Sequence, residues 1–145
     1  MTGIEAMFDA MQAVEGLGPT DLSRRNRNPL NLRAAATVPH TMDAGGYCVF
    51  ASIVDGTQAG LHELWCKVTG NNEHGIGPSS TLDELFDVYA PRGDDNNPSS
   101  YALTVASRCS SALGRTVTHL SQLRDVCPET INAATHAAPL GGKTQ

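Results

Sequence analysis

Apolar residues recur every three or four positions along much of this chain, which is the spacing of helices with one buried face. In residues 3–15 the spacing is carried by one apolar stripe: Ile4, Met7, Phe8, Met11 and Val14. The same pattern predicts a helix from Ser52 to Gly70, one from Thr81 to Pro91 and one that ends at Gly114. Two shorter helices are predicted over residues 116–126 and 128–137.

Capping signals stand at the start of two predicted helices. Ser52 is followed three positions later by Asp55, and Thr81 is followed by Glu84, so each pair can satisfy exposed backbone N–H groups. Residues 18–29, 71–80 and 92–97 are polar and without periodicity, and we predict loops there.

Two short segments, residues 31–34 and 47–50, are candidates for β-strands. Pro39 and the pair Gly45–Gly46 lie between them, so a small hairpin with a long loop is predicted. The expected fold class is therefore mainly α (α+β), a helical body with a small β-hairpin lobe. We expect one domain over residues 1–145, of which 138–145 form a flexible tail.

Glu15 is a carboxylate in an unusual place. On a helical projection it lies about 20° from Ile4, within the apolar stripe, whereas Glu5 and Asp9 point away from it. Burial and the C-terminal end of the helix dipole both disfavour its charged form, which is the condition for a general acid near neutral pH. The alternative is that Glu15 turns back to solvent or pairs with Arg24 or Arg25.

Four phrases, read together, resemble the motifs of one known protein family. Residues 13–17 (AVEGL) are similar to its helix that delivers a glutamate followed by glycine. Residues 24–33 (RRNRNPLNLR) resemble its R-N-N-N-P-G-N-(L/I) signature. Residues 45–64 and 89–105 are similar to its G-F-A-V-F and (Y/W)-A-P phrases, so the resemblance covers about two-thirds of the chain. The family that these phrases resemble is a lysozyme-like family of phages and bacteria that includes goose-type lysozymes and lytic transglycosylases.

The resemblance implies a lysozyme-like domain that cleaves β-1,4 bonds of peptidoglycan or a related amino-sugar polymer. It makes Glu15 the catalytic acid and Asp43, in the hairpin loop, the candidate second carboxylate. It also implies a glycan groove, with residues 25–31 packed beside the C-terminal end of the first helix. The substrate-binding residues that it implies are Arg25, Asn26, Asn28, Asn31, Tyr89, Asn96 and Tyr101, with Pro29 and Pro91 in the same phrases.

Alternatives remain open for this site. An asparagine in a tight turn commonly bonds its own backbone instead of a ligand. The family glycine is Leu30 here, Arg27 stands where the family has asparagine, and Ala51 replaces a proline. Some family members are virion structural proteins, so the alternative function is a non-catalytic structural or glycan-binding module on the same scaffold.

Composition excludes several other classes. The net charge is −5 and no basic run is longer than Arg24–Arg25, so no nucleic-acid partner is expected, although the same charge disfavours steering onto an anionic wall. No membrane span and no signal peptide are visible, and we expect a monomer that is secreted, periplasmic or virion-associated.

The remaining reactive side chains predict neither a cofactor nor a metal. The five histidines are scattered without ligand spacing, and no G-x-S-x-G elbow marks a serine nucleophile. The four cysteines form either up to two disulfides or small buried apolar contacts: Cys48, Cys66, Cys109 and Cys127.

Overall fold

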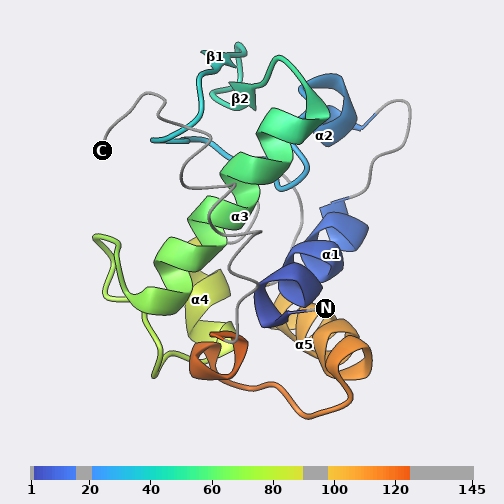
Figure 1. The fold of residues 1–145 in the computed structure, drawn as a ribbon, viewed down its shortest axis with the longest axis vertical. Helices are drawn as coiled ribbons and strands as arrows, with labels where there is room; N and C mark the ends of the chain where they lie inside the picture. Colours follow the sequence, from blue (N-terminus) through green and yellow to red (C-terminus); the bar gives the residue numbers. More distant parts are fainter. Residues whose placement is uncertain (1, 16–20, 90–97, 125–145) are drawn as a thin grey trace. The chain divides into compact units, whose positions relative to one another are not determined.

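The structure of the protein is a computed structural model that describes residues 2–15, 21–89 and 98–124. These residues are mainly helical with one small antiparallel sheet, so the predicted fold class is confirmed. Figure 1 shows the elements in chain order: α1 (Gly3–Glu15), α2 (Leu22–Arg25), β1 (Thr41–Met42), β2 (Cys48–Val49), α3 (Ile53–Thr69), α4 (Leu82–Tyr89), α5 (Pro98–Leu113) and the 3-10 helix η1 (Leu120–Leu123).

The capping signals in the sequence act as predicted. The backbone N–H of Thr81 donates to Glu84 Oε1 at 2.8 Å, and the N–H of Glu84 donates to Thr81 Oγ1 at 3.1 Å. At the start of α3 the N–H of Asp55 donates to Ser52 Oγ at 3.1 Å. Gly70 ends α3 and Gly114 ends α5, each with a positive φ, of 89° and 69°, that glycine adopts without strain.

The described residues group into two compact units, each with its own core. In unit 1 the described segments are 2–14, 64–89 and 98–124. Here α4 packs against α5, with the rings of Phe86 and Tyr101 centred 4.7 Å apart. The other large buried side chains of this unit include Ile4, Met7, Phe8, Leu64, Val68, Leu82, Leu85, Val105, Cys109, Leu120 and Leu123.

Unit 2 is described over residues 21–63 and holds the β-hairpin. Thr41 pairs with Val49 and Met42 pairs with Cys48 in the antiparallel register. Under the hairpin lies a small apolar core to which the first half of α3 contributes, formed by Ala35, Val38, Cys48, Phe50 and Ala59 with the partly buried Leu32.

The strand predicted over residues 31–34 was wrong. Asn31 has a left-handed backbone with φ 53°, which interrupts an extended segment. Leu32 still lies beside β2, because its carbonyl accepts the N–H of Cys48 at 2.9 Å, but no ladder develops. The true partner strand is Thr41–Met42, so the hairpin loop is shorter than predicted.

Two other element boundaries differ from prediction. The loop predicted over residues 18–29 contains the short helix α2. The helix predicted over 116–126 is reduced to η1, because the chain before it pairs with another segment: the N–H of Leu82 donates to the Thr118 carbonyl at 3.1 Å. The predicted helix over 128–137, the tail and the loop at 92–97 lie outside the described residues. The single domain stays a prediction.

Candidate functional site

Asp43 organises the turn of the β-hairpin. One of its carboxylate oxygens, Oδ1, accepts the backbone N–H groups of both Gly45 and Tyr47 at 2.9 Å. The Tyr47 carbonyl in turn accepts the N–H of Asp43 at 2.9 Å, and Gly46 takes the positive φ of 88° that closes the turn. The sequence placed Asp43 in a hairpin loop, and the structure makes its side chain the centre of that loop.

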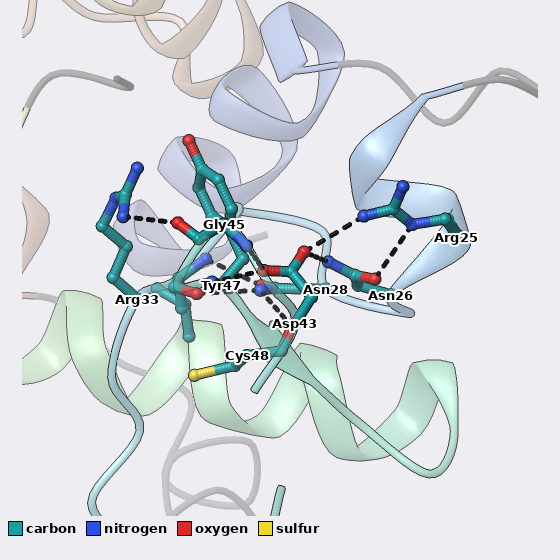
Figure 2. Close-up of polar contacts among 9 residues, drawn as sticks. Arg25, Asn26, Asn28, Arg33, Asp43, Gly45, Tyr47 and Cys48 are labelled. Atoms are coloured by element: carbon teal, nitrogen blue, oxygen red, sulfur yellow. Dashed lines mark hydrogen bonds and ion pairs between the residues drawn. The ribbon is translucent and has the colours of Figure 1, made fainter. Parts of the chain in front are cut away.

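The second oxygen of Asp43 binds the end of α2. Its Oδ2 accepts Asn26 Nδ2 at 2.9 Å and Arg25 Nη2 at 3.1 Å, so the carboxylate joins two chain segments that are 17 positions apart or more (Figure 2). The Arg25 side chain is 65% exposed, whereas that of Asp43 is only 13% exposed. Asn26, Arg25 and Asp43, all named from the sequence, therefore form one polar cluster.

These donors keep Asp43 ionised. The N–H of Tyr47 lowers the pKa of the Asp43 carboxyl most, followed by the amide of Asn26. Burial opposes this shift, and the N–H of Gly45 and the charge of Arg25 make smaller contributions that also lower the pKa. A carboxylate that already accepts four hydrogen bonds is a weak proton acceptor. It is better suited to present a fixed negative charge than to remove a proton from water.

Asn28 has a structural role beneath this cluster. Its side chain is fully buried, and its amide Nδ2 donates to the carbonyls of Leu32 and Cys48, both at 3.0 Å. Its Oδ1 accepts the N–H of Leu32 at 2.9 Å. A buried amide with three internal bonds is not exposed to a sugar, so Asn28 follows the alternative in which an asparagine serves the turn.

At residues 27–31 the left-handed backbone positions differ from those that the resembled signature would place at a glycine. Leu30 is buried and has no positive φ; the left-handed conformation falls on Asn31, a residue type that tolerates it. Arg27 is also left-handed, with φ 52°, and its Nε donates to the Phe50 carbonyl at 2.6 Å. The loop therefore keeps a tight path without the glycine.

Sequence reasoning missed Arg33 and Tyr47 as members of this cluster. Arg33 Nη1 donates to the Gly45 carbonyl at 3.1 Å, and its guanidinium carbon lies 4.1 Å from the centre of the Tyr47 ring. Figure 2 shows the two side chains beside the turn that Asp43 holds. The available signal was their position: each lies inside one of the phrases that resemble the lysozyme-like family.

The tyrosines predicted to bind substrate belong to unit 1. Tyr101 is 4% exposed and packs on Phe86, so it belongs to the core of that unit. Tyr89 is half-buried, with Lys67 Nζ 4.1 Å above its ring and His74 edge-on at 5.3 Å. Asn96 and Pro91 lie outside the described residues.

Glu15 is the last residue of α1, and its side chain lies outside the described part of the structure. The expected packing of residues 25–31 beside the end of α1 stays a prediction.

Two of the four cysteines are buried thiols. Cys48 lies in the core of unit 2 and Cys109 in that of unit 1, and neither forms a disulfide. Burial raises the pKa of both thiols, that of Cys109 to about 11 with help from the nearby Asp9 charge. For these two residues the structure agrees with the alternative of small buried apolar contacts; Cys127 lies outside the described residues.

Within residues 2–15, 21–89 and 98–124, no group of three or more potential ligands among His, Cys, Asp and Glu could hold a metal ion. No helix in the described part of the chain is long and apolar enough to cross a membrane. Comparison of the chain with protein-family models, with curated proteins and with solved structures found no match.

Proposed function

We propose that this protein cleaves β-1,4 glycosidic bonds of peptidoglycan or a related amino-sugar polymer, as a glycoside hydrolase or a lytic transglycosylase. Glu15 is the general acid that protonates the leaving oxygen. Asp43 is the ionised carboxylate near which positive charge develops on the sugar ring. On this proposal the protein is a monomer, and it is secreted, periplasmic or virion-associated.

The observation that carries the proposal is the Asp43 cluster. A carboxylate held ionised by four donors stands in a hairpin turn, next to Arg25 and Asn26 of the signature-like phrase. Glycoside cleavage needs two carboxyl groups in different states, one protonated and one charged. The apolar stripe around Glu15 favours the first state, and the donors around Asp43 favour the second.

The different protonation states of Glu15 and Asp43 restrict the chemistry. Since Asp43 already accepts four hydrogen bonds, it acts through its charge, which stabilises an oxocarbenium-like transition state. The attacking group is then a water molecule or a hydroxyl of the substrate itself. Glu15 is deprotonated once the bond has broken. It then acts as the general base that receives the proton of that nucleophile.

The test is the substitution Glu15→Gln, compared with Glu5→Gln in the same helix. Glu15→Gln keeps the size of the side chain and removes its proton-donating carboxyl, so wall lysis should fall by about 10²–10⁴-fold while the helical content is unchanged. In a capping box, Glu5 Oε1 accepts the N–H of Thr2 at 2.9 Å, and the side-chain oxygen of glutamine can accept the same N–H. Glu5→Gln should therefore keep full activity. Turbidity of cell-wall suspensions measures the activity, and circular dichroism checks the fold.

A second candidate function is a non-catalytic glycan-binding or virion structural module. The observation in its favour is that all four donors around Asp43 come from the protein itself, so the carboxylate also has a complete structural role. This candidate predicts wild-type protein that sediments with cell walls and lyses none of them. Equal lysis by wild type and Glu15→Gln would likewise contradict the catalytic proposal.

A further inference from the structure

The surface charge of unit 2 differs from that of the whole chain. The chain has a net charge of −5, but residues 21–63 contain as many arginines as carboxylates. The arginines are all exposed: Arg24, Arg25, Arg27 and Arg33. The carboxylates are all half-buried: Asp21, Asp43, Asp55 and Glu63. The exposed charged groups of this segment are therefore positive.

Two of these arginines are fixed on the hairpin turn. Arg25 is held by Asp43 Oδ2 and Asn26 Oδ1, and Arg33 is held by the Gly45 carbonyl and the face of the Tyr47 ring (Figure 2). Gly46 leaves room for Arg33, because a Cβ at that position would lie 3.0 Å from Nη1. Within the described residues the other N–H groups of Arg25 and Arg33 have no hydrogen-bond partner.

Held guanidinium groups with unused donors are suited to bind anions. A guanidinium binds carboxylate or phosphate through paired N–H donors, and fixing the side chain in advance reduces the entropy lost on binding. Asp43 offsets part of the charge of Arg25, whereas no acidic side chain contacts Arg33 in the described structure. The Tyr47 ring helps to hold Arg33, whose guanidinium carbon lies 4.1 Å from the ring centre.

We propose that Arg25 and Arg33, here called the hairpin arginine surface, bind the carboxylate or phosphate groups of an anionic glycan. The anion-binding part stands on the geometry alone, and the glycan part rests on the proposed function. The surface gives an acidic protein a positive region with which to approach an anionic wall. We favour a glycan over a nucleic acid because the whole chain, with a net charge of −5, lacks the broad positive footprint that a nucleic acid requires.

The test measures binding of the full chain to polygalacturonate over a series of salt concentrations, with the methyl-esterified polymer as the neutral counterpart. Wild type should bind the charged polymer, with affinity that falls as salt rises, and bind the neutral polymer weakly. The double variant Arg25→Gln, Arg33→Gln should lose about 10-fold or more in affinity, and the salt slope should fall by about 2. Competition by inorganic phosphate then tells whether phosphate groups occupy the same site.

The matched control is Arg108→Gln, Arg124→Gln, which changes the net charge equally at two exposed residues of unit 1. This control variant should bind the charged polymer with the affinity of wild type. An equal loss of affinity in both double variants would overturn the proposal. Wild-type protein that binds neither polymer would also overturn it. Tighter binding to single-stranded DNA of equal charge would reject the glycan class. If the hairpin double variant does not fold, Arg33→Gln alone should lower the salt slope by about 1. Because polygalacturonate binding needs no bond cleavage, absence of wall lysis leaves this result intact.

Discussion

At the scale of single residues, the Asp43 carboxylate makes the stability of the folded protein depend on pH. Its pKa in the folded protein lies below the ordinary value of 3.8, first because of the Tyr47 N–H and then because of the Asn26 amide. The contribution of this carboxylate to stability is therefore complete above pH 3.8 and is lost as the pH falls below that value through the folded-state pKa.

Asp43→Asn should remove this dependence. An amide at this position faces the donors of Asn26 and Arg25 with its own NH2 group, so two favourable contacts become a clash of donors. We expect a melting temperature several degrees lower than that of wild type at neutral pH, and a smaller difference at about pH 2.5. Melting curves at both pH values measure this. Asp55→Asn, in the first turn of α3, is the control; a constant difference between wild type and Asp43→Asn across the range would contradict the assignment.

The sequence identified Asp43 as a candidate and could not assign its role. Its position between a proline-containing segment and a hairpin strand was readable, but its partners depend on α2, a four-residue helix too short to show periodicity. For the same reason Asn26 and Asn28 looked alike in the sequence. Only the fold distinguishes Asn26, which contacts Asp43, from Asn28, which is buried under the hairpin.

At the scale of elements, α3 and the loop before the hairpin approach so closely that one glycine is required. A Cβ on Gly56 would overlap the carbonyl oxygen of Arg27, a backbone atom that cannot rotate away as a side chain can. Gly56→Ala should therefore destabilise the protein by about 1–3 kcal/mol, despite the better helix propensity of alanine. Denaturant unfolding gives the measurement.

Gly45→Ala is the matched control in the same unit. Gly45 has no positive φ, and its nearest neighbour would be an ordinary contact at 3.5 Å, so alanine should be tolerated there. A Gly56→Ala variant as stable as wild type would show that the loop at Arg27 moves freely.

The elements that the sequence predicted well are those whose signals are local. The helices α3 and α4 start at capping residues, and α3 and α5 end at glycines, all within a few positions of the predicted boundaries. The strand predicted at residues 31–34 was wrong because Asn31 takes a left-handed backbone and the Asn28 side chain bonds the backbone of Leu32. The helix predicted at 116–126 was wrong because a distant segment pairs with it, through the N–H of Leu82 that donates to the Thr118 carbonyl.

At the scale of the whole molecule, the two buried thiols report on the two units separately. Cys48 belongs to unit 2 and Cys109 to unit 1, and α3 supplies residues to both, 53–63 to one and 64–69 to the other. Because one continuous helix is shared, we expect both thiols to become reactive at the same denaturant concentration. Pulsed alkylation, read for each cysteine by peptide mass spectrometry, measures the two midpoints. Labelling of Cys48 well before Cys109 would mean that the units unfold independently.

The division of unit 1 along the chain also affects the order in which the protein can fold during synthesis. The apolar face of α1 leaves the ribosome before the rest of its unit, which begins at residue 64. The described part of unit 2, residues 21–63, is continuous and emerges in between. At a synthesis rate of about 5–20 residues per second, several seconds pass before the packing partners of α1 have been synthesised. During that interval the apolar side chains of α1, among them Met7 and Phe8, cannot pack against residues 64–89 and 98–124 of their unit.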